Sequence, residues 1–151
     1  MRSNNVAIRA LFAVVAGLAC ATAALASSAN FVVTAAGVEL GKPEEVTEKD
    51  RTVMRYSVKA EVGKPFTLTA QGRAYGRGDT KGRPTAPESG AWSFDGKVMA
   101  KGKDGKKADE SEVVVTLTPS AAGKSVVRFT GKVLGYERTV EVVVEAVETK
   151  K

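Results

Sequence analysis

Hydrophobic and polar residues alternate with a period of two along much of this chain. In the segment TVMRYSVKAEV (52–62), one face carries Met54, Tyr56, Val58, Ala60 and Val62, while charged and polar residues fill the positions between them. Successive side chains of a β-strand point to opposite faces, so this alternation is typical of a half-buried strand. We therefore predict a strand that ends at Gly63-Lys64-Pro65.

The same pattern predicts further short strands, and no convincing amphipathic helix accompanies them. Asp95-Gly96 separates two of them and is typical of a two-residue hairpin turn. The stretch NFVVTAA (30–36) is either an added edge strand or a linker, and 41–51 is a charged linker. The other predicted strands are 66–71, 91–94, 97–100, 112–118, 125–133 and 138–147.

Short strands at this spacing predict an all-β fold, an immunoglobulin-like antiparallel β-sandwich of about seven to eight strands. We expect the sandwich to span 52–148, after an N-terminal strand and charged linker (27–51) and before a basic tail (149–151). The residues predicted to form its core are Phe66, Leu68, Trp92, Val115, Leu117, Val127, Phe129, Val140, Val142 and Val144.

Three segments carry a resemblance to a known family: VGKPFTLTA (62–70), VVVTLTPSAAGKSVVRFTG (113–131) and RTVEVVVEA (138–146). They resemble bacterial immunoglobulin-like (Big/PKD-like) modules, which often read Val-Gly-x-Pro into the second strand and Pro-x-x-x-Gly before the sixth. The disulfide and tyrosine corner of antibody-type domains are missing, since Ala121, Ser125 and Val127 occupy those positions.

The N-terminus has the pattern of a secretory signal peptide. Arg2 and Arg9 precede a short apolar stretch (10–26), and Ala24-Leu25-Ala26 matches a cleavage site. We predict cleavage after residue 26, which leaves no transmembrane anchor and places the protein in the periplasm or outside the cell. Lipidation of Cys20 is disfavoured, because Gly17 matches poorly the residue expected three positions before a lipidated cysteine.

The composition of the predicted mature chain argues against catalysis. Cleavage removes 26 of 151 residues and leaves 125 with a net charge of +4, no cysteine and no histidine. Cys nucleophiles, Ser-His pairs and zinc-His sites are thereby excluded. Asp104, Asp109 and Glu110 make a weak calcium candidate, for which exposed turn residues are the simpler interpretation. We predict no enzymatic activity, no metal and no cofactor.

In an immunoglobulin-like sandwich the B–C, D–E and F–G loops gather at one end. Here these loops are 72–90, 101–111 and 134–137, and the first is predicted to lie exposed outside the core. Tyrosines among cations suit an acidic glycan or an acidic protein surface, while flexible solvated loops are the alternative. The candidate binding residues are Arg73, Tyr75, Arg77, Asp79, Lys81, Arg83, Lys101, Lys103 and Tyr136.

The first loop contains the tripeptide Arg77-Gly78-Asp79, which is an integrin ligand in animal matrix proteins. An integrin partner is disfavoured, because the signal peptide and the module resemble those of bacterial proteins, which have no integrins. No nucleic-acid partner is expected.

The predicted strand order and the segment VGKPFTLT (62–69) also resemble chagasin-type inhibitors of cysteine peptidases. That family has an Asn-Pro-Thr-Thr-Gly loop, a Gly-rich loop and an Arg-Pro-aromatic loop. QGRAYGRGDTKG (71–82), KGKDGKKADE (101–110) and VLGYER (133–138) occupy those places, and the first and third motifs are missing. The sequence therefore predicts a secreted or periplasmic binding or structural module, with inhibition of cysteine peptidases as the alternative function.

Overall fold

The computed structural model describes residues 28–103 and 106–150. The predicted signal peptide, Cys20 and Asp104 lie outside the described residues. The described chain is all-β, and its strands are β1 (Ser28–Ala36), β2 (Glu44–Glu48), β3 (Arg51–Glu61), β4 (Phe66–Tyr75), β5 (Arg83–Pro84), β6 (Ser89–Ser93), β7 (Met99–Lys101), β8 (Glu112–Pro119), β9 (Gly123–Val133) and β10 (Tyr136–Val147).

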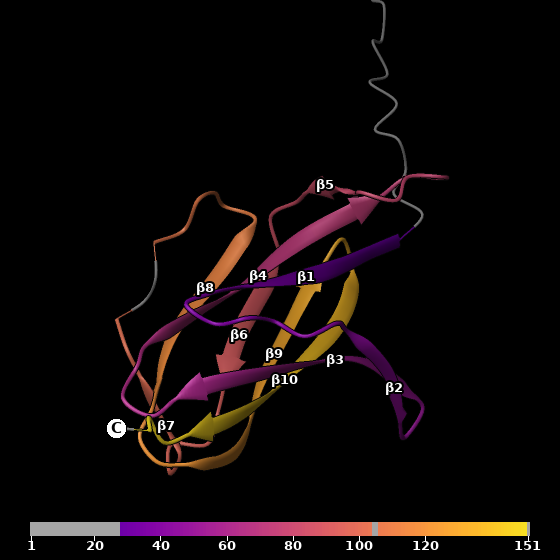
Figure 1. Ribbon diagram of the computed structural model, residues 1–151. Coiled ribbons are helices and arrows are strands. Elements are labelled where there is room, and N and C mark those ends of the chain that lie inside the picture. The colour runs from indigo at the N-terminus through magenta and orange to yellow at the C-terminus, as the bar shows by residue number, and fades with distance from the viewer. Residues whose placement is uncertain (1–27, 104–105, 151) are drawn as a thin grey trace, which may run out of the picture.

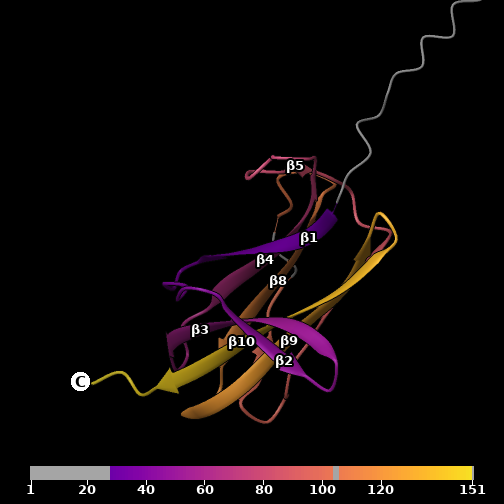
Figure 2. The ribbon, with the colours of Figure 1, turned by 90° about the vertical axis from the view of Figure 1, so that its right-hand side faces the viewer.

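The strands form two sheets that pack face to face (Figures 1 and 2). One sheet has the order β1-β4-β8-β7, with the short β5 paired to β4, and the other has the order β2-β3-β10-β9-β6. Most pairs are antiparallel, but β3 runs parallel to β10, with Met54 opposite Val140. The prediction of a wholly antiparallel sandwich is therefore wrong for this pair.

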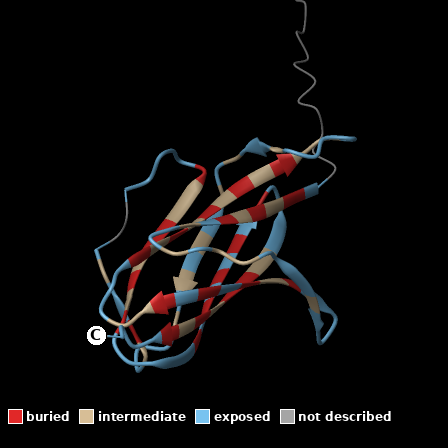
Figure 3. Cartoon of the chain, in the orientation of Figure 1, coloured by how far each residue is buried: buried red, intermediate tan, exposed pale blue. Residues whose placement is uncertain are grey.

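The core lies between the sheets and follows the period-two alternation (Figure 3). In β9, for example, Val127, Phe129, Gly131 and Val133 are buried, whereas the residues that alternate with them are exposed. Every residue predicted for the core except Trp92 belongs to this cluster, and Trp92 packs against it while partly buried. The predicted core is confirmed.

The stretch predicted as an edge strand or a linker is an edge strand. β1 pairs antiparallel with β4 along its whole length, from Ser28 opposite Tyr75 to Ala36 opposite Thr67. Its inward side chains enter the core, where the Phe31 ring meets the Phe129 ring edge to face at 4.7 Å between centroids. Burial of alternate apolar residues stabilises this strand as it does the others.

Within the predicted charged linker 41–51, Glu44–Glu48 form β2, which makes a two-residue hairpin with β3. The segment before β2 lies along β3, where the Gly41 N–H donates to the Ser57 carbonyl at 2.8 Å. Val38 and Leu40 in this segment pack against the core.

The predicted hairpin around Asp95-Gly96 does not form. β6 pairs with β9 in one sheet, whereas β7 pairs with β8 in the other. The Met99 N–H donates to the Asp95 carbonyl at 3.2 Å, so the chain makes a five-residue turn. This wider turn carries the chain across to the other sheet, where the Met99 side chain is fully buried.

The predicted loop 72–90 is shorter than expected. β4 continues to Tyr75 because β1 accompanies it to that point, and Gly72 and Ala74 are buried. Gly72 is needed for close approach, since a Cβ there would lie 2.4 Å from the Thr85 carbonyl oxygen. β5 then pairs back to β4, and only the tip beyond Tyr75 leaves the sheet.

Candidate functional site

The candidate site is the tip of the connection that follows β4. Residues Gly76 to Gly82 project from the sandwich end, and the Asp79 N–H donates to the Gly76 carbonyl at 3.1 Å to form a tight turn. Gly78 has a φ of +77°, which a glycine adopts without the steric cost of a side chain. The Arg77-Gly78-Asp79 tripeptide therefore occupies the turn itself.

Two of the candidate residues brace this tip from inside. The Arg73 guanidinium Nη1 donates to the carbonyls of Lys81 at 2.8 Å and Gly82 at 3.3 Å. Asp79 Oδ1 accepts the backbone N–H groups of Lys81 at 2.9 Å and Gly82 at 3.0 Å. The N–H of Gly82, followed by that of Lys81, holds the pKa of Asp79 below its ordinary value.

The remaining cations of the tip point outward. Arg77 and Lys81 are exposed, and neither side chain has a partner within the described part of the chain. Arg83 is exposed on β5, and Tyr75 is half-buried. Gly82 lies against the Tyr75 ring, since a Cβ there would come within 2.8 Å of it. The structure thus brings Arg73 through Arg83 together.

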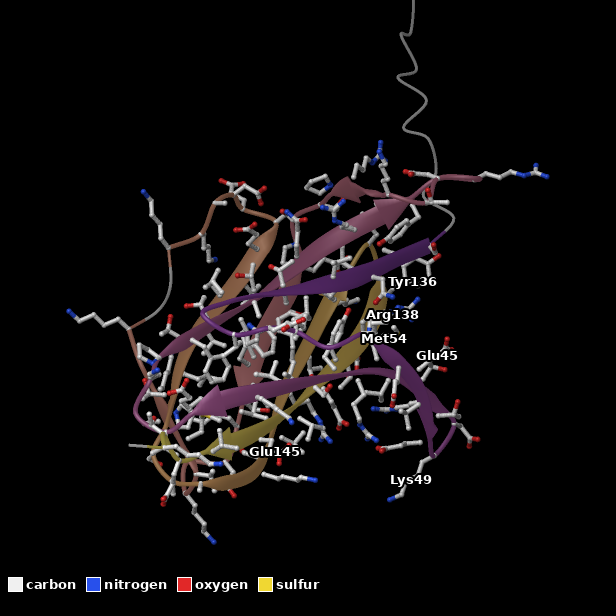
Figure 4. The ribbon with its side chains drawn as sticks, in the orientation of Figure 1. Glu45, Lys49, Met54, Tyr136, Arg138 and Glu145 are labelled. Atoms are coloured by element: carbon white, nitrogen blue, oxygen red, sulfur yellow. The ribbon has the colours of Figure 1, made fainter. Side chains whose placement is uncertain are left out.

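Tyr136 begins β10 at the same end of the sandwich. The Glu88 carboxylate Oε1 accepts the Gly135 N–H at 2.7 Å and so ties the β9–β10 turn to the chain before β6. The Tyr136 side chain is 37% exposed, and the Arg138 guanidinium lies 5.2 Å from its ring centroid (Figure 4). Arg138 also donates to the Ala29 carbonyl at 3.1 Å, which fixes the position of this pair.

Lys101 and Lys103 are not at this end. Lys101 on β7 pairs with Leu117 on β8, and Leu117 pairs with Phe66, the first residue of β4. Tyr75, at the other end of β4, lies nine residues farther along that strand. At about 3.3 Å per residue this separation is about 30 Å. The Gly102 N–H donates to the Thr116 carbonyl at 2.7 Å, so Lys103, the next residue, also starts near the end opposite the tip.

One charged cluster was not predicted from the sequence. Glu141 on β10 is only 3% exposed and lies between Arg55 on β3 and Arg128 on β9 in register. Arg55 Nη2 donates to Glu141 Oε2 at 2.8 Å and to Glu48 Oε1 of β2 at 2.7 Å, and Arg128 binds Oε1 of Glu141. Alternation shows that these residues share the outer face, but only the register shows that they meet.

Burial of Glu141 by itself favours the neutral acid, but the hydrogen bonds from Arg128 and Arg55 outweigh it and keep the pKa below its ordinary value. The carboxylate is therefore ionised and fully engaged, which does not suit a general acid.

Several loop carboxylates act as local caps. Asp95 accepts the Lys97 N–H at 2.9 Å, and Asp109 accepts the Ser111 N–H at 2.7 Å. Glu112 accepts the Ala108 N–H at 2.7 Å. Such bonds between an acid and a nearby backbone N–H stabilise turns. Residues 28–103 and 106–150 contain no group of three or more potential metal-ligating side chains.

No protein-family model, curated protein or solved structure matches this chain. Among the residues that the structure describes, no helix is long and apolar enough to cross a membrane.

Proposed function

We propose that the chain is an immunoglobulin-like module. The sheet orders support this proposal: β1-β4-β8-β7 corresponds to strands A-B-E-D of that fold, and β10-β9-β6 corresponds to G-F-C. β3 then corresponds to a second part of strand A that has moved to the other sheet, which explains its parallel pairing with β10. This fold accommodates many functions, so the residues of the site, and not the fold, indicate what the module does.

We propose that the module binds an acidic glycan through the braced tip Gly76–Gly82, outside the cytoplasm as the predicted signal peptide implies. The observation that carries the proposal is that some polar side chains hold the backbone of the tip while others remain exposed to solvent. Arg73 and Asp79 hold the backbone, while Arg77 and Lys81 remain exposed without partners among the described residues. A loop held in place loses less conformational entropy on binding, so its cations bind an anion more tightly.

The nearby tyrosines suit a sugar partner. Tyr75 is half-buried beside Gly82, and Tyr136 is partly exposed next to Arg138 at the same end. Aromatic rings provide apolar stacking area with a polar tip, and guanidinium groups bind carboxylates in two-point contacts. Asp79 contributes to the architecture of the turn, which supports an internal role for this carboxylate rather than integrin recognition.

The decisive experiment is Asp79→Ala, measured as the affinity for immobilised polygalacturonate. The substitution removes a negative charge, so simple attraction between a basic protein and a polyanion predicts tighter binding. Loss of the brace predicts weaker binding, because Lys81 and Gly82 lose their acceptor. We expect binding at least threefold weaker, and a larger loss for Arg77→Ala combined with Lys81→Ala.

Asp95→Ala is the matched control, because Asp95 is also exposed, also caps its own turn, and carries the same charge. We expect it to bind as well as the wild type or slightly better. Equal effects of the two Asp variants would contradict the proposal. Titration of papain with the same protein tests the alternative function that the sequence suggested, inhibition of cysteine peptidases. Stoichiometric inhibition would support that function in place of glycan binding.

A further inference from the structure

A second surface lies on the side of the sandwich, away from the braced tip. A groove of about 360 Å³ runs between β6 of one sheet and β8 of the other. β7 ends at Lys101, beyond which Gly102 donates to the Thr116 carbonyl at 2.7 Å. In the described part of the chain, Glu112–Val115 therefore pair only with β4, and β6 pairs only with β9. Both strand edges that border the groove lack a partner strand among the described residues.

The floor of the groove is apolar and fixed in position. Trp92 and Phe94 line it together with Val113, and all three are partly exposed. The Trp92 Nε1–H donates to the Val113 carbonyl at 2.9 Å, and the indole packs against the Phe129 ring at 5.1 Å between centroids. Partly exposed aromatic side chains whose orientation is already fixed are typical centres of binding sites.

The edge strand β6 lacks the usual protection against pairing. Its sequence SGAWS carries no charge, whereas the edge strand β2 of the same sheet, EEVTE, carries three glutamates. Charged side chains on edge strands discourage the addition of another strand. β6 is therefore suited to accept one, by the mode in which an extended peptide joins a sheet edge.

The rim of the groove determines the charge of the occupant. Lys101 and Lys107 line the groove, and they are its only charged lining residues within the described chain. Asp109 and Glu110 belong to the same β7–β8 connection but do not line the groove. A second copy of this chain would bring two lysine-rich rims together, which opposes self-pairing. A segment with alternating acidic and apolar residues would place apolar side chains on the aromatic floor and carboxylates beside the lysines.

We propose that this groove binds an extended acidic segment of a partner protein, which adds as a strand to the free edge of β6. The proposal is independent of glycan binding at the tip, since the two surfaces share no residue.

The probe is a fluorescent acetylated peptide of four Glu-Val repeats, titrated into the full chain and followed by anisotropy and by amide chemical shifts. We expect saturable binding with shifts concentrated in β6. Lys101→Glu combined with Lys107→Glu should weaken binding at least tenfold and allow a Lys-Val peptide to bind instead. Lys59→Glu combined with Lys124→Glu makes the same charge change on β3 and β9, away from the groove, and should change the affinity less than twofold.

A third peptide, N-methylated at alternate amides, separates strand addition from charge attraction because it cannot donate to an edge. It should not bind. Equal binding of the N-methylated peptide, equal loss in both lysine variants, or shifts outside β6 and β8 would overturn the proposal. Concentration-dependent broadening of β6 amides without peptide would also overturn it, in favour of a second copy as the occupant.

Discussion

Leu134 has a left-handed backbone conformation, which residues with a Cβ atom rarely adopt. Leu134 and Gly135 connect β9 to β10 with φ values of +48° and +79°, and Val133 pairs directly with Tyr136. Two central residues with positive φ define the type I′ turn that suits the twist of a hairpin. Gly135 adopts this region freely, whereas an ordinary L-residue pays about 1–2 kcal/mol.

We expect Leu134→Asn to stabilise the protein by about 1 kcal/mol, because asparagine tolerates the left-handed region. Thermal unfolding should show a midpoint about 3–6 °C higher. Leu134→Ala is the control: it removes the exposed leucine, which is 45% accessible, but keeps a Cβ in the left-handed region. A similar gain in both variants would mean that the exposed apolar surface, rather than the backbone, is the cause.

At the scale of elements, the outer face of the second sheet is held by charge across neighbouring strands. Glu141 joins β3 and β9 through Arg55 and Arg128, and Glu48 extends the cluster to β2. Surface ion pairs contribute little singly, but this carboxylate is buried beneath two guanidinium groups that remain partly exposed. Removing such a carboxylate leaves two cations without their shared partner.

We expect Glu141→Gln to lower the free energy of unfolding by roughly 1–3 kcal/mol at neutral pH, less than for a fully buried pair because water reaches both arginines. The pKa of Glu141 is lower in the folded protein than in the unfolded chain, so its stabilising effect is complete above the ordinary glutamate pKa. The effect disappears as the pH falls through the lower folded value. Urea unfolding of both proteins at several pH values between 7 and about 2.5 measures this difference.

Glu145→Gln is the control on the same strand and the same face, where no ion pair is formed within the described chain. It should change stability little at any pH. A difference between wild type and Glu141→Gln that persisted undiminished at the lowest pH would show that shape or packing, and not ionisation, explains the effect.

At the scale of the whole molecule, both sheets share one core, and β1 is part of it. Ala29, Phe31 and Val33 are buried with residues from the other sheet, and β1 gives β4 a partner over nine positions. The described chain contains no cysteine, so no disulfide compensates for lost packing there. Loss of β1 would also expose an edge of β4 with alternating apolar residues.

We therefore expect a predicted mature chain that lacks 28–36 to show no cooperative unfolding transition. Removal of Phe31 alone should cost about 3–5 kcal/mol, against a total of about 5–15 kcal/mol for a typical domain. Differential scanning calorimetry is the measurement. A chain shortened at its other end, after Val147, should still unfold cooperatively, since the described tail residues 148–150 contribute little more than the Thr149 hydroxyl bond to Glu61 at 3.0 Å. Cooperative melting of both variants would contradict this prediction.

The sequence by itself determined where most strands lie and which of their faces is buried. Alternation is a local property, so β3, β4, β9 and β10 and the core residues Phe66, Leu68, Phe129 and Val142 could be predicted without knowing any partner strand. The exposed basic tip from Gly76 to Gly82 could also be predicted, because its turn residues and charges exclude a buried strand, although the sequence did not show that β4 continues to Tyr75. What Arg73 and Asp79 do there could not be predicted, since their roles are defined by the backbone groups they bind.

The tertiary structure alone decided which strands are neighbours. β6 and β7 lie in different sheets, β3 runs parallel to β10, and β1 closes the edge of β4, although each was a plausible strand or linker in isolation. Pairing depends on residues far apart in the chain, so no local pattern reports it. For the same reason Lys101 lies at the side groove and not at the predicted site, and Glu141 is buried between two arginines. Register, not residue type, brings these groups to their partners.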